Sequence, residues 1–243
     1  MFKPNTLIKS LKHQEATLNK EFSILCWNVA KLTLNSSYKV FIDSLIDTYS
    51  FDILLLQEAK KHISLDLDLY DYSYILSPNI ETKKHIFGVL SAFRASCIDE
   101  FSLLTKKREL AYITHKVSLI TRHKLPNGAK LVVVNLHAIN FVKNSDFKDE
   151  LDYIYESIKS YTGSMIVAGD FNTWNRQRVS FLLEFAKELS LNPVDFNDKS
   201  NLKKVFSNSI DYIFYRDLVL LDSKIIDSKN ISDHNPIIAK FSI

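Results

Sequence analysis

The sequence predicts a mixed α/β domain in which helices cover β-sheets. Runs rich in β-branched and aromatic residues are typical of strands, and they lie at 23–29, 51–56, 85–93, 110–120, 130–138, 164–169, 210–215 and 236–243. Stretches with apolar residues at helical spacing separate several of these runs. Strands that alternate with helices indicate sheets covered by helices, and ligands commonly bind such folds beyond the carboxyl ends of the strands.

The helical spacing is clearest after the run at 130–138. Ser145 is placed to cap this helix and Gly163 lies just past its end, while its apolar face is formed by Phe147, Leu151, Ile154, Ile158 and Tyr161. A second helix repeats the spacing with Val179, Leu182, Leu183, Ala186 and Leu189, and 38–49 is a weaker third. The turn signal Pro126, Asn127 and Gly128 predicts an antiparallel hairpin between 110–121 and 129–138.

Length and composition favour one globular domain. The chain has 243 residues, of which 46% are hydrophobic and 24% charged, as in ordinary globular proteins. No repeat, linker or low-complexity block interrupts the chain after Phe22, so we expect a single domain over 21–243 and a polar, basic tail over 1–20. The four glycines are too scattered for G-x-G-x-x-G or P-loop motifs, which excludes Rossmann and P-loop nucleotide binding.

Charge and cysteine usage bear on partners and compartment. The net charge is only +3, so any anionic partner must be held by a local cluster. Cys26 and Cys97 lie far apart in apolar stretches, which indicates free thiols in a reducing compartment. Basic residues break up the apolar stretches near the N-terminus, and no run approaches the roughly 18 apolar residues of a membrane span. We therefore expect a cytoplasmic protein without a membrane span or an obligate protein partner.

Polar residues end several of the predicted strands, where a ligand pocket is expected. These residues are Asn28, Gln57 with Glu58, Asn135 with His137, and Asp170 with Asn172, joined near the C-terminus by Asp211, Asp233 and His234. Oxygen ligands for a hard cation, proton-transfer groups and amide donors are what metal-assisted hydrolysis of a phosphate ester requires. Singly, each has an ordinary explanation as a solvated carboxylate, a turn residue or a core histidine.

The set of motifs, taken in order, resembles the endonuclease/exonuclease/phosphatase superfamily. The matching stretches are ILCWNVAK, DILLLQEA, VVVNLHAIN, GDFNTW, SIDYIFY and SDHNPI, from about residue 22 to the end. NLHAINF, EFAKELSL and IDYIFYRDL look most like the bacterial YafD-like group. The resemblance implies a deoxyribonuclease I-like α/β fold, a four-layer sandwich of two mixed β-sheets packed face to face with helices outside.

The resemblance also implies residue roles. Glu58 matches the direct Mg²⁺ ligand, with Asn28 and Asp233 in or next to the metal shell and Mn²⁺ as the alternative ion. Asp170 and Asn172 match the pair that orients the attacking water and holds a phosphate oxygen, and Asp211 is expected to orient His234. His137 matches the strand histidine of deoxyribonuclease I-like members, whereas abasic-site endonucleases carry tyrosine there. The acidic partner of that histidine has no clear match, and Glu109 is the candidate.

We expect a metal-dependent phosphoric ester hydrolase, and first a nuclease that hydrolyses phosphodiester bonds by in-line attack of water. A phosphomonoesterase, a lipid-headgroup or inositol phosphate phosphodiesterase, and a non-catalytic binding module are the alternatives. Trp174, Arg176 and Arg178 follow the GDFN turn and are expected to stack a base and hold phosphates. The alternative is that the tryptophan only packs the helix start and the arginines are solvated or paired.

Overall fold

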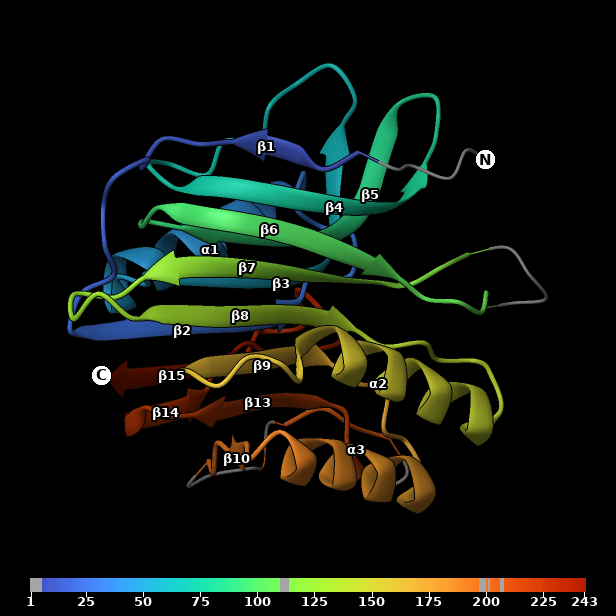
Figure 1. Cartoon of the computed structure of the whole chain (residues 1–243). Helices are drawn as coiled ribbons and strands as arrows, with labels where there is room; N and C mark the ends of the chain where they lie inside the picture. The colour runs from blue at the N-terminus through green and yellow to red at the C-terminus, as the bar shows by residue number, and fades with distance from the viewer. Residues whose placement is uncertain (1–5, 110–113, 197–199, 201, 206–207) are drawn as a thin grey trace.

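The protein is a four-layer sandwich of two β-sheets with helices on both outer faces (Figure 1). The computed structural model describes residues 6–109, 114–196, 200, 202–205 and 208–243. One sheet contains, in chain order, β1 (Ile8–Ser10), β2 (Glu21–Asn28), β3 (Ile53–His62), β4 (Ser73–Glu81), β5 (His85–Phe93), β14 (Val219–Ile225) and β15 (Ile237–Ser242). The fold class predicted from the sequence is confirmed.

The second sheet packs face to face against the first. It contains β6 (Cys97–Leu104), β7 (Val117–Lys124), β8 (Lys130–His137), β9 (Met165–Asp170), β10 (Asn192–Pro193) and β13 (Asp211–Arg216). A small ribbon pairs β11 (Lys204–Val205) with β12 (Asn208–Ser209), and the helices are α1 (Ser36–Tyr49), α2 (Asn144–Ile158) and α3 (Arg176–Glu188).

Two parallel strand pairs place the polar strand ends. The first sheet has the order β1-β4-β5-β3-β2-β15-β14 and the second β10-β13-β9-β8-β7-β6. β2 runs parallel to β3 and β8 parallel to β9, and each pair is connected through a helix, α1 or α2. The carboxyl ends of β8 and β9 face the right of Figure 1. Asn28 at the end of β2 bonds to Asp170 at the end of β9, so both sheets present these ends at the same edge.

The apolar residues form three packed layers. Alternate residues of β2 face opposite ways: Ile24 and Cys26 pack between the sheets, while Leu25 and Trp27 pack under α1. A third cluster joins the second sheet to α2 and α3. Strands buried on both faces explain the continuous apolar runs of the sequence. In the described part of the chain no helix has the length and apolar character to cross a bilayer.

The predicted hairpin is confirmed, with β7 and β8 antiparallel around a turn in which Gly128 has a φ of +81°. Its first strand begins at Val117, and residues 110–113 of the predicted run lie outside the described residues. The sequence did not predict β4, β6 and β14. Pro78 sits in β4 beside a register shift, where the missing N–H is tolerated, and β6 and β14 are partly exposed edge strands without a clear pattern.

Two local predictions are wrong. Residues 6–20 are not a free tail, because β1 pairs with β4 and Leu18 packs in the core between the sheets. Ser145 is not a helix cap, since α2 begins at Asn144 after Lys143, which forms no side-chain cap bond, and Gly163 lies beyond the end of α2 at Ile158.

We expect Gly169→Ala to lower the free energy of unfolding by roughly 2–4 kcal/mol, because the new Cβ would overlap backbone. Gly169 has a φ of +150° and its added Cβ would lie 1.8 Å from the carbonyl oxygen of Leu136 on β8. Urea denaturation measures the change. Gly163→Ala is the matched control, since its Cβ would meet its nearest atom at an ordinary 3.6 Å. Equal stabilities of the two variants would contradict the close approach of β9 and β8.

Candidate active site

A cavity of 680 Å³ opens where the carboxyl ends of β2, β8 and β9 meet the middle of β3. Most of the residues selected from the sequence line it: Asn28, Glu58, His137, Asp170, Asn172, Trp174, Asp233 and His234. Asp211 lies behind His234, to which it is bonded. Arg176 and Arg178 are not among the lining residues. The fold therefore brings together side chains that are up to about two hundred positions apart in the chain, as the bond from Trp27 Nε1 to the carbonyl oxygen of His234 illustrates.

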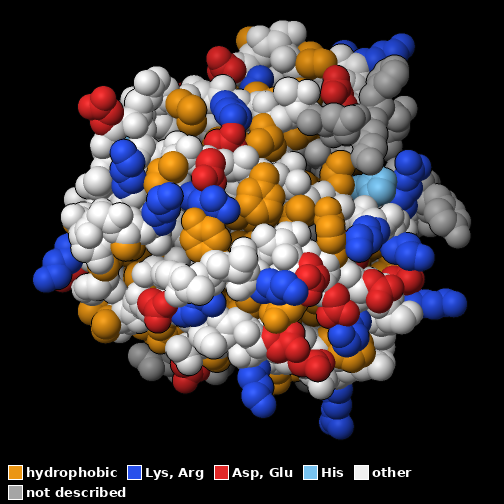
Figure 2. Space-filling model, viewed as in Figure 1, with side chains coloured by type: hydrophobic (Ala, Val, Ile, Leu, Met, Phe, Trp, Pro, Cys, Tyr) orange, Lys and Arg blue, Asp and Glu red, His pale blue; other side chains and the backbone are white. Residues whose placement is uncertain are grey.

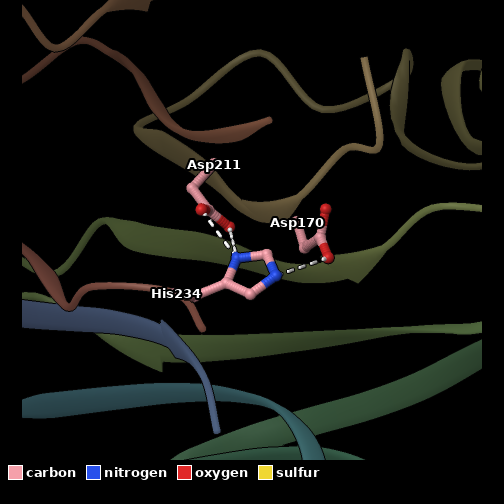
Figure 3. A group of neighbouring side chains, drawn as sticks. All are labelled: Asp170, Asp211 and His234. Atoms are coloured by element: carbon pink, nitrogen blue, oxygen red, sulfur yellow. Dashed lines mark hydrogen bonds and ion pairs between the residues drawn. The ribbon is translucent and has the colours of Figure 1, made fainter. Parts of the chain in front are cut away.

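Asp211, His234 and Asp170 form a buried cluster at the base of this cavity (Figure 3). Antiparallel pairing of β13 with β9 sets Asp211 opposite Asp170. Nδ1 of His234 lies 2.8 and 3.0 Å from the two carboxylate oxygens of Asp211, and Nε2 lies 3.8 Å from Oδ2 of Asp170. Because Nδ1 faces a carboxylate, it carries a proton, and Nε2 is directed toward Asp170 and the cavity.

The carboxylates keep His234 charged. Burial by itself lowers the pKa of this imidazole, but Asp211, followed by Asp170 and Asp233, outweighs burial and raises the pKa to about 9. Burial and the neighbouring charge of Asp211 raise the pKa of Asp170, against the opposing effect of His234. At neutral pH the cluster thus combines an imidazolium with a carboxylate that accepts a proton more readily than an ordinary aspartate.

The turn after β9 holds Asp170 and Asn172 in place. Asp170 Oδ1 accepts the backbone N–H of Asn172 at 3.0 Å, and Oδ2 accepts the side-chain amide of Asn28 at 3.0 Å. Asn172 has a φ of +50°, and its amide nitrogen donates to the carbonyl oxygen of Ala138. A left-handed asparagine is tolerated because its short side chain bonds locally.

A bulge in β3 aims Glu58 into the cavity. The register of β3 with β5 shifts between Leu56 and Ala59, and Glu58 has a φ of +54°. Its carboxylate lies 3.5 Å from the ammonium of Lys31 and 3.6 Å from that of Lys116. Left-handed residues other than glycine cost free energy and concentrate at functional sites. Asn28 and Asp233 line the same cavity, but Asp233 pairs with Lys203 at 2.7 Å.

Lys116 is the main site residue that the sequence did not reveal. Its Nζ lies 2.9 Å from Nε2 of His137, 3.6 Å from Glu58 and 3.7 Å from Glu109. Burial and the nearby Lys116 charge lower the pKa of His137 well below its usual value. Because an ammonium can only donate, Nε2 of His137 accepts. The hairpin register, with Ser118 opposite Leu136, continues to Val117 opposite His137, so it gave no signal for Lys116, which lies just before β7.

Glu109, considered as the partner of His137, meets Lys116 instead. Its Oε2 lies 3.7 Å from Nζ of Lys116, and its Oε1 accepts the backbone N–H of Asn140. Burial raises the pKa of Glu109, and Lys116 opposes this effect. The ammonium therefore stands between the acid and the histidine.

The assignment of Arg178 to phosphate binding is wrong. Its side chain has 0% exposure and donates to the carbonyl oxygens of Ile139, Asn140, Val142 and Asn172. The guanidinium also lies 4.7 Å from the centre of the Trp174 ring and 4.6 Å from that of Phe147. Arg178 is thus a structural cross-link behind the cavity. Arg176 is exposed on the first turn of α3, and Trp174 lines the cavity with its indole N–H bonded to Asn140.

The donor set fits a hard divalent cation. Glu58, Asp170 and Asp233 with the amide of Asn28 offer oxygen ligands around one cavity. Asp170, Asp211 and His234 also present ligand atoms within 4.8 Å of one another, so this cluster is a possible metal site.

Comparisons with known proteins agree with this geometry. The model of the Endonuclease/Exonuclease/phosphatase family matches residues 25–234. A UPF0294 protein of Erwinia tasmaniensis is 31% identical over 224 residues, covering 90% of this chain and 81% of the relative. The structure of an endonuclease/exonuclease/phosphatase family protein from Leptotrichia buccalis superposes with a TM-score of 0.70 at 19% identity, covering 91% of this chain and 100% of that one. The human Nocturnin catalytic domain with bound sulfate anion superposes with a TM-score of 0.65 at 17% identity over 98% and 97% of the two chains.

We expect Asp211→Asn to lower the pKa of His234 from about 9, because burial then acts against the charged form with less opposition. His234 would then lose its proton at a lower pH than in the wild-type protein, and the alkaline limb of the rate profile would shift to lower pH. An NMR titration of the His234 ring measures the pKa. Asp217→Asn, on an exposed carboxylate beyond β13, is the control. An unchanged titration would contradict the pairing.

Arg178→Met is expected to lower the free energy of unfolding by about 3 kcal/mol or more, because several buried carbonyl oxygens lose their donor. Arg176→Met, two positions earlier on the exposed side of α3, should change stability by less than about 0.5 kcal/mol. Urea denaturation of both variants provides the comparison. If the two variants were equally stable, the bonds of Arg178 to the 139–142 segment would not matter for folding.

Proposed function

Because the chain belongs to the Endonuclease/Exonuclease/phosphatase family, we propose that this phosphoric ester hydrolase uses Mg²⁺ to cleave the phosphodiester bonds of nucleic acid by in-line attack of water. The observation that carries the proposal is the placement of Asp170 beside the Asp211–His234 pair, in a cavity that Glu58 and His137 also line. Hydrolysis needs a proton acceptor, a cation facing the phosphoryl oxygens and oxygen ligands for a metal, and all are present together.

Each residue has a role that follows from its surroundings. Asp170, held by Asn28 and the Asn172 amide, accepts the proton of the attacking water. The imidazolium of His234 and the side-chain amide of Asn172 stabilise the charge that develops on the phosphoryl oxygens. Of the two histidines, His234 is the better proton donor to the leaving oxygen, because the pKa of His137 is lowered by burial and Lys116.

The metal would be held by Glu58, with Asn28 and Asp233 close by in the same cavity. When bound, Mg²⁺ or Mn²⁺ supplies Lewis-acid polarisation of a phosphoryl oxygen. The ammonium groups of Lys31 and Lys116 lie within 3.6 Å of the Glu58 carboxylate. They partly neutralise its negative charge when no metal ion is bound. To bind the metal ion, Asp233 would have to give up its ion pair with Lys203.

Nucleic acid is the substrate class we favour over phosphomonoesters, inositol phosphates and lipid headgroups. Trp174 lines the cavity, and the neighbouring Phe141 is 68% exposed, so aromatic faces are available beside the reacting phosphate. Cys26 and Cys97 are free thiols, which supports the proposal that the enzyme works in a reducing compartment such as the cytoplasm. Turnover of a single-stranded oligonucleotide, a plasmid, an inositol phosphate and a small phosphomonoester, each with Mg²⁺, Mn²⁺ or chelator, tests the choice. Exclusive turnover of the monoester would overturn it.

We expect Glu58→Gln to reduce kcat/KM by roughly 100-fold or more and to raise the Mg²⁺ concentration needed for activity, because a charged ligand is removed. Activity on a phosphodiester is measured against Mg²⁺ concentration. Asp152→Asn removes an exposed carboxylate of α2 and should leave the curve unchanged. Full activity in excess chelator, or an unchanged curve for Glu58→Gln, would remove Glu58 from the metal site.

A further inference from the structure

A second hollow of 780 Å³ opens directly beside the catalytic cavity. Phe141 and Trp174 line both hollows, so the two hollows adjoin at these aromatic rings. The other lining residues come from the loop after β6 and from the segment that leads into α2: Lys106, Lys107, Arg108, Val142, Lys143 and Asp146. We call this second hollow the basic groove.

The basic groove carries a local excess of positive charge. Lys106, Lys107, Arg108 and Lys143 are all exposed, and Asp146 is the one acid among the lining residues. Figure 2 shows several Lys and Arg side chains on the right of the view, the side on which β6 ends in Figure 1. The ion pair of Lys107 with Asp146, at 3.6 Å, is partly exposed and therefore weak. For a chain of net charge +3, this is a pronounced local concentration.

Internal bonds fix the conformation of the basic loop. Buried Glu150 on α2 accepts the backbone N–H groups of Lys106 and Lys107 at 2.6 and 3.1 Å, so it holds the loop through its backbone. Lys106 Nζ lies over the ring of Tyr153 at 4.4 Å, and Arg108 donates to His115. Lys143 precedes α2 and forms no side-chain cap bond, which leaves the positive end of the helix dipole at this edge.

The aromatic pair between the two hollows is rigidly supported. Trp174 donates its indole N–H to Asn140 at 3.1 Å, and Arg178 lies against its ring. Arg178 also binds the carbonyl oxygens on both sides of Phe141, those of Asn140 and Val142. Phe141 nevertheless remains 68% exposed. Exposing a large aromatic ring costs free energy, and a ring held still in an exposed position is suited to stacking.

We propose that the basic groove binds a single-stranded segment of nucleic acid, with a base stacked on Phe141 and flanking phosphates held by Lys106, Lys107, Arg108 and Lys143, and leads the strand into the catalytic cavity. The inference rests on the proposed function and assigns its substrate a strand-binding surface. Phosphates alternate with planar bases along a single strand, which matches cations that flank aromatic rings. In a duplex the bases are already paired and stacked, so the rings gain no new partner without unpairing.

The binding test uses chelator, so that no hydrolysis takes place. Fluorescence anisotropy follows the binding of an oligothymidylate of roughly 12 nucleotides at several salt concentrations. The variant Lys106→Ala/Lys107→Ala/Arg108→Ala should bind at least tenfold more weakly, with a log–log salt slope reduced by about 0.7 for each phosphate that is no longer neutralised. Lys159→Ala/Lys187→Ala/Lys224→Ala removes the same charge from exposed positions outside the groove and should change neither quantity.

Phe141→Ala and Phe141→Tyr separate stacking from charge. We expect about tenfold weaker binding for alanine and near-normal binding for tyrosine, with the salt slope unchanged in both. Circular dichroism and urea denaturation confirm that each variant is folded. Polyphosphate and a duplex of the same sequence serve as competitors. Equal competition by polyphosphate would overturn the stacking of a base, and tighter binding of the duplex would overturn the preference for a single strand.

Failure of this inference is distinguishable from failure of the proposed function. Binding is measured without metal, whereas hydrolysis of a small phosphodiester by the wild-type enzyme with Mg²⁺ reports on catalysis alone. Hydrolysis of the small diester without groove-dependent oligonucleotide binding would overturn the groove and leave the catalytic proposal standing. Groove-dependent binding without any hydrolysis would support the groove and contradict the catalytic proposal.

Discussion

The face-to-face packing of the two sheets is the constraint on which the site depends, and a buried amide pair sets it. Gln57 on β3 donates to Asn135 on β8 at 2.7 Å, and both side chains have 0% exposure. Asn135 in turn donates to the carbonyl oxygen of Leu90. An amide left unpaired in this apolar layer would cost about 1–3 kcal/mol, so sliding one sheet past the other is penalised. Glu58 follows Gln57 in the chain, and His137 lies two residues beyond Asn135. With the sheets in this position, the Glu58 carboxylate lies 3.9 Å from Nε2 of His137.

The packing concentrates charge that would be unfavourable without compensation. Asp170 and Asp211 are buried on neighbouring strands, and His234 lies between them as the cation that both carboxylates share. Lys116 has the corresponding position among Glu58, Glu109 and His137. The cavity thus has one histidine, His234, whose pKa is raised by carboxylates, and one, His137, whose pKa is lowered by burial and by Lys116. Left-handed residues at Ala30, Lys31, Glu58 and Asn172 surround these groups, and strain of that kind persists where neighbouring bonds over-determine the backbone.

Arg178 shows how a cation can shape a substrate surface without touching the substrate. The Arg178 guanidinium is buried against the rings of Trp174 and Phe147. It donates hydrogen bonds to carbonyl oxygens of the 139–142 segment, which follows β8 and has no strand partner among the described residues. Burial lowers the pKa of Arg178 to about 10, and its charge is stabilised by backbone dipoles. This cross-link lies behind Trp174 and Phe141, and the cations of the basic groove beside them come from the loop after β6 and from Lys143.

The sequence by itself determined the helices, the strands buried on both faces and most of the polar residues that line the cavity. Periodicity located the helices and the strands buried on both faces. Polar residues such as Glu58 and Asp170 were recognisable because they follow a hydrophobic run, although β3 continues past Glu58 to His62. Edge strands such as β6 and β14 lacked that contrast. Only the tertiary structure decided which charges face solvent and which pairs meet. Arg176 and Arg178 read alike in the sequence, and packing against α2 buries one while leaving the other exposed. Lys116, just before β7, meets His137 only in the tertiary structure, because the hairpin register sets Val117 rather than Lys116 across from His137. The physical reason is that burial and pairing between residues distant in the chain depend on how whole elements pack, whereas helix and strand formation depends on side chains a few positions apart.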